Sequence, residues 1–190
     1  MKKVLLMAAV LLSSVGAMAQ HAVGGITLQP RAGLSVANIA DTKGDPRYGV
    51  VGGADFEYQA NDWLGISAGA VYSQQGYKKD GATAKIDYIN IPLMGHFYVA
   101  KGLSLNVGVQ PGFKVSNKIT SGSVTYDVTN NDAVETFDFS MPVGLAYELP
   151  SVPLVFDARY NFGFTDAWKA GDNHPQNQVF QFTVGYKFDL

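Results

Sequence analysis

Apolar and polar residues alternate with a period of two along nearly the whole chain from Ile26 onward, and no stretch sustains the spacing of an amphipathic helix. Because successive side chains of a strand point to opposite sides, this alternation predicts strands with one apolar and one polar face. The clearest case is 103–115, where odd positions are apolar and even positions are small or polar. We expect eight strands, near residues 26–36, 48–60, 64–77, 85–99, 103–117, 135–149, 153–164 and 178–190.

The connections between these segments alternate in length. Short connections with turn-forming residues fall at 61–62, 101–102 and 150–152. The longer connections are 37–47, 78–84, 118–134 and 165–177. This pattern predicts an all-β fold, an eight-stranded antiparallel up-and-down barrel with long loops at one end, and that asymmetry is typical of transmembrane β-barrels.

The composition of the two faces indicates which of them points outward. The apolar face of the expected strands carries no Asp, Glu, Lys or Arg, and its large aromatics fall near both strand ends, as in the two aromatic girdles of a membrane barrel. The opposite face carries the charges together with many glycines, which suits the narrow interior of an eight-stranded barrel. We therefore expect a lipid-facing apolar wall. The alternative is a periplasmic lipocalin-like barrel that binds an apolar ligand.

The charged side chains of the polar face are expected to form an ion-pair and hydrogen-bond network inside the barrel. Buried charges are costly unless they are paired, so the role of this network would be structural. The expected lumenal residues are Arg31, Asp55, Glu57, Lys114, Glu148, Asp157, Arg159 and Lys187.

The first residues predict an export signal. Lys2 and Lys3 precede an apolar run from Val4 to Leu12, and small residues follow at Ala17 and Ala19. A transmembrane helix needs about 20 apolar residues, about twice the length of this run. We expect a signal peptide at 1–19, cleaved near Ala19, and a single barrel domain at 20–190 located in the cell outer membrane.

Several stretches resemble a known family. They are Tyr88–Met94, Leu103–Phe113, Asp138–Leu149, Arg159–Gly163 and Val179–Phe188. Over nearly the whole expected mature chain, the sequence resembles the small outer-membrane β-barrel family labelled porin-like or PorT-like, found in Gram-negative bacteria. The resemblance implies an outer-membrane barrel and an accessory role in protein secretion as one alternative function. Solute diffusion is not expected, because a filled eight-stranded lumen has no continuous water path.

The sequence offers little for catalysis. It contains no cysteine, and its histidines are His21, His96 and His174. A nucleophilic triad built from His174 with Ser121 or Ser123 would require loop contacts that the sequence does not encode. His96 has the parity of the polar face, where we expect a lumenal hydrogen bond. We expect no enzyme, no cofactor and no metal site; a lipid-modifying outer-membrane enzyme is the alternative.

The long loops are the expected place of function, through a structural or interaction role. Residues 123–128 still alternate, which predicts a hairpin above the membrane; an unstructured loop is the alternative. Tyr126 and Trp168 are the expected contact anchors, since aromatic residues are enriched at binding hot spots. The expected partners are outer-membrane lipid, the barrel assembly machinery and a protein at the loops. A net charge of −2 disfavours nucleic acid, and we expect a monomer.

Overall fold

The computed structural model describes residues 21–39, 44–79, 81–122, 124–128, 135–166 and 176–190. The strands in these ranges are β1 (Ile26–Ile39), β2 (Asp45–Asn61), β3 (Leu64–Lys79), β4 (Ala82–Asn90), β5 (Leu93–Ala100), β6 (Leu103–Ser121), β7 (Val124–Asp127), β8 (Phe137–Glu148), β9 (Leu154–Asp166), β10 (Gln176–Tyr186) and β11 (Phe188–Asp189). Within the described residues there is no helix long and apolar enough to cross a membrane.

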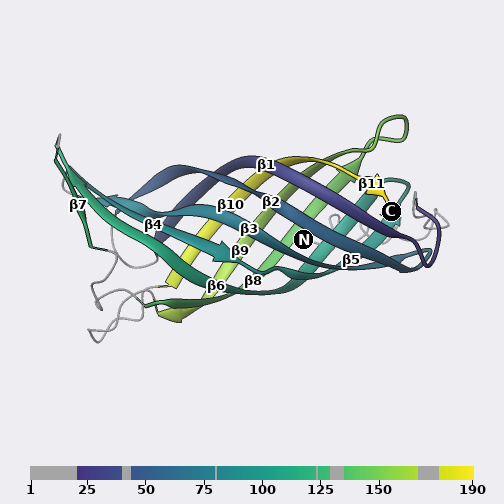
Figure 1. The fold of residues 1–190 in the computed structure, drawn as a ribbon, viewed down its shortest axis with the longest axis horizontal. Coiled ribbons are helices and arrows are strands. Elements are labelled where there is room, and N and C mark those ends of the chain that lie inside the picture. Colours follow the sequence, from purple (N-terminus) through teal and green to yellow (C-terminus); the bar gives the residue numbers. More distant parts are fainter. Residues whose placement is uncertain (1–20, 40–43, 80, 123, 129–134, 167–175) are drawn as a thin grey trace, which may run out of the picture.

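The strands form one closed antiparallel ring (Figure 1). Around the ring the order is β1, β2, β3, β4 with β5, β6, β8, β9 and β10. β1 closes the ring against β10 in the register Arg31↔Gly185 to Ile39↔Asn177. β4 and β5 occupy one position of the ring, because both pair with β3 and with β6. β10 and β11 both pair with β1 and likewise share a position. The predicted eight-stranded barrel is therefore confirmed.

Two of the expected strands are interrupted. The expected strand at 85–99 breaks at Ile91 and Pro92, because proline has no N–H to donate. The Ile91 N–H still donates to the Pro111 carbonyl at 2.8 Å, and the Pro92 carbonyl accepts from Gly69 N–H at 3.1 Å, so bonding to both neighbouring strands continues. The expected strand at 178–190 breaks at Lys187, whose N–H donates to the Pro153 carbonyl at 2.8 Å.

The strands run further toward the long-loop end than the alternation predicts, and one forms a hairpin. β6 continues to Ser121 and pairs with β7 from Ser121↔Val124 to Lys118↔Asp127. Gly122 has φ 58°, the left-handed conformation that glycine adopts readily at a turn. The predicted hairpin is thus present, and it projects beyond the other strands in Figure 1. Residues 129–134 of the same connection lie outside the described residues.

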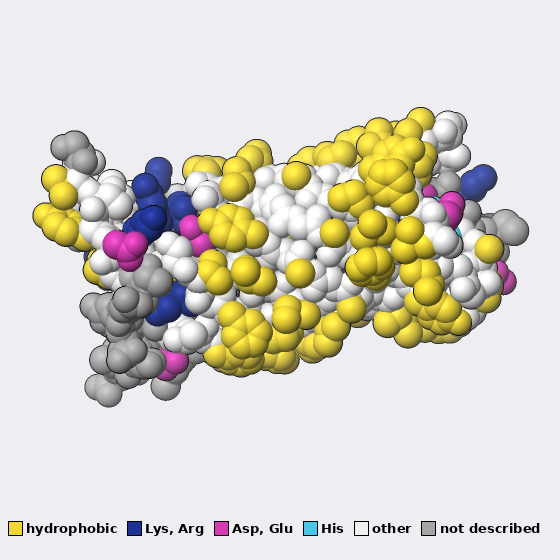
Figure 2. All heavy atoms as spheres, in the orientation of Figure 1, with side chains coloured by type: hydrophobic (Ala, Val, Ile, Leu, Met, Phe, Trp, Pro, Cys, Tyr) yellow, Lys and Arg dark blue, Asp and Glu magenta, His cyan; other side chains and the backbone are white. Residues whose placement is uncertain are grey.

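The apolar face points outward, as predicted. Leu34 is 62% exposed and Phe56 is 54% exposed, and the nine aromatics of the two expected girdles all lie on the outer surface. They are Phe56, Tyr58, Phe97, Tyr147 and Phe188 toward the short turns and Tyr72, Phe113, Phe137 and Phe162 toward the long loops. Figure 2 shows hydrophobic side chains coating the barrel wall on the visible face. The lipocalin-like alternative is wrong, because it requires the polar face to be outside.

The interior has two layers. Toward the short turns it is polar and includes Arg31, Glu57 and Lys187, each at most 5% exposed. Toward the long loops it contains a buried apolar cluster of Ile39, Ile86 and Tyr88, against which Tyr77 packs. The expectation of a wholly polar lumen is therefore incomplete, since β4 places apolar side chains on its inner face as well.

Candidate functional site

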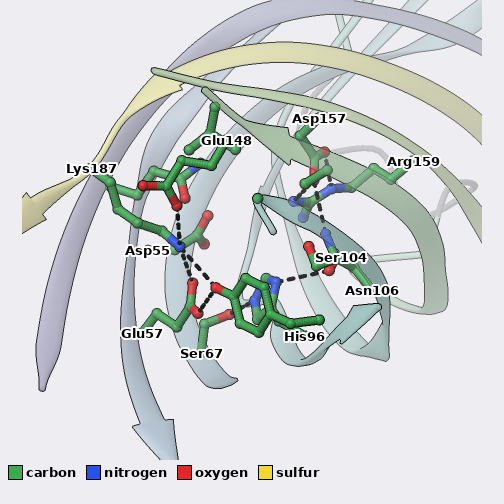
Figure 3. A pocket seen from close by; sticks show the side chains of 15 residues that line it. Asp55, Glu57, Ser67, His96, Ser104, Asn106, Glu148, Asp157, Arg159 and Lys187 are labelled. Atoms are coloured by element: carbon green, nitrogen blue, oxygen red, sulfur yellow. Dashed lines mark hydrogen bonds and ion pairs between the residues drawn. The ribbon is translucent and has the colours of Figure 1, made fainter. Parts of the chain in front are cut away.

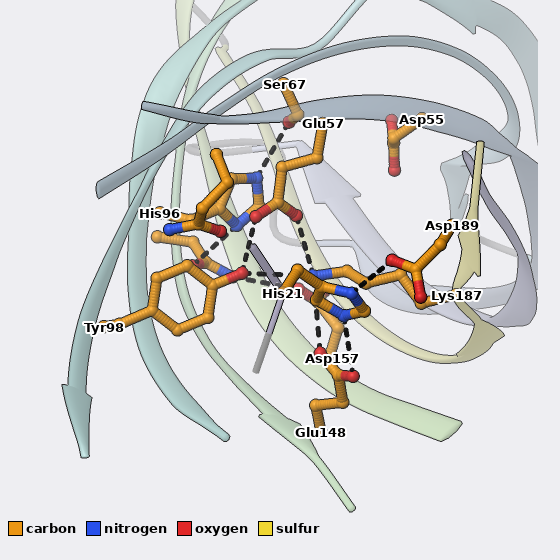
Figure 4. A network of polar contacts seen from close by, with 12 residues as sticks. His21, Asp55, Glu57, Ser67, His96, Tyr98, Glu148, Asp157, Lys187 and Asp189 are labelled. Carbon is orange, nitrogen blue, oxygen red and sulfur yellow. Dashed lines mark hydrogen bonds and ion pairs between the residues drawn. The ribbon is translucent and has the colours of Figure 1, made fainter. Parts of the chain in front are cut away.

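The polar layer of the lumen is centred on Lys187, which follows β10. Its Nζ lies 2.9 Å from Oε2 of Glu57 on β2 and 3.5 Å from Oε2 of Glu148 on β8. Nζ also donates to the Tyr98 hydroxyl of β5 at 3.1 Å, and that hydroxyl donates in turn to Glu57 Oε1 at 2.5 Å. These contacts, drawn in Figure 4, tie the closing strand to three others across the lumen.

His21 caps this cluster at the short-turn end. Its Nε2 lies 2.9 Å from Oε1 of Glu148, and its Nδ1 lies 2.6 Å from Oδ1 of Asp189 (Figure 4). The His21 side chain is 8% exposed although it precedes the first strand. The hydrogen bond to Glu148 raises the pKa of His21 above its usual value, aided by Asp189 and opposed by burial and by Lys187. The His21 ring therefore joins the segment before β1 to β8 and β11.

A second cluster is built around Asp157 and Arg159, which are neighbours on the inner face of β9. The guanidinium binds the carboxylate in a two-point contact, with Nε to Oδ1 at 2.7 Å and Nη2 to Oδ2 at 2.9 Å. Asn106 Nδ2 donates to Asp157 Oδ2 at 3.3 Å. The bidentate geometry is the strongest form of such a pair and fixes both side chains.

The expected lumenal hydrogen bond of His96 is present and extends this second cluster. His96 Nδ1 lies 3.0 Å from Asn106 Oδ1, and its Nε2 lies 2.8 Å from the Ser67 hydroxyl (Figure 3). Because a carbonyl oxygen only accepts, Nδ1 carries the proton, and a neutral ring then accepts the Ser67 hydrogen at Nε2. The chain Ser67–His96–Asn106–Asp157 therefore has one consistent set of donors and acceptors.

A third ion pair, between Arg31 on β1 and Asp55 on β2, lies on neighbouring strands. Arg31 Nε donates to Asp55 Oδ2 at 2.5 Å, and the Arg31 side chain is fully buried. Gly69 on β3 makes room for it, since a Cβ at that position would overlap the Asp55 carboxylate and lie 2.9 Å from its Cα. Gly65 does the same for Glu57, since a Cβ there would overlap the Glu57 carboxylate.

The structure brings together seven of the eight expected lumenal residues in this layer. Lys114 is the exception: it is half-buried on β6 and pairs in register with Tyr88, at the level of the apolar cluster. The residues that sequence reasoning omitted are His21, Ser67, Tyr98 and Asn106. Tyr98 and Asn106 share the inward parity of their strands, so parity was a sufficient signal for both. His21 lies outside every strand pattern and gave no such signal.

The space that remains among these side chains is small. The cavity bounded by the two clusters has a volume of about 20 Å³, which is room for one water molecule (Figure 3). Its lining contains four carboxylates, Asp55, Glu57, Glu148 and Asp157, with Arg159 and Lys187 as cations. This arrangement can hold strands together by charge, and it offers no volume for an organic substrate. Among the described residues no group of three His, Cys, Asp or Glu side chains could hold a metal ion.

The structure describes only some of the loop residues that the sequence singled out. Tyr126 is on β7 and is 60% exposed. Trp168, Ser123 and His174 lie outside the described residues, as does the proposed signal peptide. Ser121 is exposed at the end of β6.

Comparison with known proteins settles the family. The sequence profile described as "Outer membrane protein beta-barrel domain" matches residues 18–169. The chain belongs to this family of outer-membrane β-barrel proteins. The polar cluster just described is therefore the interior of a membrane-spanning barrel, and the exposed aromatics face lipid. No curated protein matches the sequence.

Solved structures show the same fold at low sequence identity. Ail, the attachment invasion locus protein of Yersinia pestis, is 16% identical, with 88% of this chain and 100% of that chain covered and a TM-score of 0.54. Neisserial surface protein A is 15% identical, with 86% and 97% covered and a TM-score of 0.56. OprG from Pseudomonas aeruginosa is 13% identical, with 89% and 98% covered and a TM-score of 0.51.

Proposed function

We propose that the protein is a non-enzymatic outer-membrane barrel with a closed lumen, which acts by presenting the β6–β7 hairpin to a protein partner outside the membrane. The observation that carries this proposal is the hairpin itself. All four residues of β7 are exposed, including Val124 at 49% and Tyr126 at 60%. An ordered apolar surface that projects into water is typical of interaction sites.

The two faces of the hairpin differ in chemistry. Ile119 and Tyr126 are directly opposite each other and therefore share a face, and both are exposed. On the other face the Thr120 and Thr125 hydroxyls lie 3.0 Å apart and form a hydrogen bond that supports the hairpin. The apolar face is the contact surface in this proposal, with Tyr126 as the anchor.

The side chains inside the lumen support the same proposal, because they argue against transport of solutes through the barrel. The interior is occupied by paired charges toward the short turns and by the apolar cluster of Ile39, Ile86 and Tyr88 toward the long loops. A solute would have to cross both layers. The outer surface is then the part of the barrel left for function.

The proposal is tested by photo-crosslinking in cells. A crosslinker placed at Tyr126 should capture a discrete protein, and Tyr126→Ala should abolish capture by a crosslinker at position 124. Thr125→Ser, on the other face of the same strand, keeps the hydroxyl that bonds to Thr120; it is the matched control and should retain capture. Deletion of residues 121–132 should abolish capture and leave an inserted barrel with heat-modifiable migration on gels. Absence of any discrete product at position 126, or a deletion that cannot insert, contradicts the proposal.

A further inference from the structure

A groove in the outer wall interrupts the aromatic girdle at the short-turn end of the barrel. It has a volume of about 580 Å³, within the range of about 300–1,000 Å³ that is usual for small-molecule sites. Four neighbouring strands line it, β1, β2, β3 and β5. Glu57 and Ser67 border the groove, but their side chains are buried on the lumenal side. The outward-facing side chains of the lining are uncharged: Ile26, Phe56, Tyr58, Ile66, Ala68 and Leu93.

The groove exists because the residues of its floor are small. Ile66 pairs with Gly95 and Ala68 pairs with Leu93, so Ala68 and Gly95 are diagonal neighbours on β3 and β5. The backbone does not require a glycine at position 95, since its φ is outside the left-handed region. Packing does not require it either, because an added Cβ would lie no closer than 3.3 Å to its nearest neighbour, the edge of the exposed Phe97 ring. The missing side chain at Gly95 therefore keeps the groove open and has no other role in the wall.

Large side chains stand on both sides of this floor. On β2, Phe56 pairs with Ala68 and is 54% exposed, and Tyr58 is 48% exposed. On β5, Leu93 is 46% exposed. A narrow apolar occupant would therefore contact protein on two sides and along the floor.

The level of the groove in the membrane follows from the aromatic side chains at its lower end. Trp63, in the turn between β2 and β3, is exposed and stacks on Phe97 with ring centroids 6.2 Å apart. Trp and Tyr rings lie at the membrane–water interface, so Trp63 and Tyr58 mark the level of the headgroups. The short turns of outer-membrane barrels face the periplasm. The groove therefore lies among the acyl chains of the periplasmic leaflet.

The position of the groove indicates what fills it. Because the chain belongs to an outer-membrane family, the medium in contact with this wall is lipid. Acyl chains gain little by leaving other acyl chains, so a preference for the groove has to come from van der Waals contact. A chain in the groove has more such contact than a chain on the smooth wall. A second barrel would rest on the protruding rings of Phe56 and Tyr58 and would bridge the floor instead of filling it.

We propose that this groove is a binding site for one acyl chain of a phospholipid in the periplasmic leaflet, which it retains in preference to the rest of the wall. The floor of Ala68 and Gly95 admits the chain, and Phe56, Tyr58 and Leu93 hold it from the sides. The site is at the opposite end of the barrel from the β6–β7 hairpin and does not depend on the function proposed for the hairpin.

The experiment uses the protein refolded into phosphatidylcholine vesicles that contain a phosphatidylcholine with a photoactivatable diazirine on one acyl chain. After irradiation, peptide mass spectrometry maps the labelled residues. Ala68, Leu93 and their neighbours should carry about fivefold more label than Leu145 on β8 and Phe156 on β9, the ratio that about ten additional van der Waals contacts give. Leu145 and Phe156 face lipid at the same end of the barrel, so this comparison needs no variant.

Filling the groove should remove the excess label. Ala68→Leu with Gly95→Val covers the floor and should lower the labelling there to that of Leu145 and Phe156; Ala68→Leu alone should lower it in part and replaces the double variant if that one does not insert. Ala158→Leu, the matched control, adds a leucine to the lipid-facing side of β9 and should leave the excess unchanged. Even labelling around the wild-type barrel or an unchanged excess in an inserted filled variant overturns the proposal. Loss of the excess as the protein-to-lipid ratio rises also overturns it, because a second barrel would then be the occupant.

Discussion

Lys187 joins four strands of the barrel through one ammonium group. It contacts Glu57, Glu148 and Tyr98, and each of these is at most 5% exposed. A buried charge that loses its partner is far more costly than an exposed one, because water cannot replace the lost contact. The stability of the short-turn end therefore depends on this residue more than on any surface pair.

Lys187→Met should lower the free energy of unfolding by about 3–5 kcal/mol, since it leaves the buried Glu57 carboxylate without its cation and removes one cation from Glu148, which keeps its contact with His21. Adding Glu57→Gln to this variant should recover part of the loss, because it removes one of those charges. Urea unfolding of the vesicle-inserted protein measures both. A Lys187→Met variant within about 1 kcal/mol of wild type would show that the contacts are not coupled.

Two adjacent glycines provide a second residue-scale test. A Cβ on Gly53, which faces the lumen, would overlap the Ala70 carbonyl oxygen and lie 2.7 Å from Val71 Cα. A Cβ on Gly52, which faces outward, would lie 3.6 Å from its nearest neighbour, the Arg31 carbonyl oxygen. Gly53→Ala should therefore destabilise the barrel by about 1–3 kcal/mol. Gly52→Ala should stay within about 0.5 kcal/mol in the same unfolding assay. Equal destabilisation by the two variants would contradict the close approach of β2 and β3 at Gly53.

At the scale of elements, the segment before β1 is fastened by His21 to Glu148 of β8 and Asp189 of β11, with Lys187 nearby. Because the folded-state pKa of His21 is raised, its protonation contributes stability that is fully present below about pH 6.5. That contribution is lost as the pH rises through the raised pKa. Thermal unfolding of the wild type should therefore move to lower temperature as the pH is raised from about 6 to 9. His21→Gln should remove this pH dependence of the unfolding temperature. The same pH dependence in the variant and the wild type would contradict the role of His21 in holding the segment before β1.

The sequence predicted the strands, their outward faces and the hairpin, because a lipid-facing strand requires strict alternation. It did not predict the break at Pro92 or the apolar cluster around Tyr88. Alternation shows neither: a missing N–H leaves the parity intact, and the inward parity of Ile86 and Tyr88 does not tell that they pack together with Ile39. The ion pairs were predictable as a set of residues. Their individual partners depend on barrel registers such as Arg31↔Gly53, which parity alone does not give.

At the scale of the whole molecule, the barrel wall encloses one layer of paired charges and one layer of apolar side chains, and the proposed function takes these layers to close the lumen. In the proposed function, the outer surface acts through the β6–β7 hairpin. The proposed function depends on this division between a closed lumen and an exposed hairpin that binds a partner.

The most direct test of this account is single-channel recording on the refolded protein in planar bilayers, with insertion verified by heat-modifiable migration. The account predicts no stepwise conductance at neutral pH, because the paired charges around Lys187 and the cluster around Tyr88 both block the lumen. A reproducible open level in most insertions would contradict it.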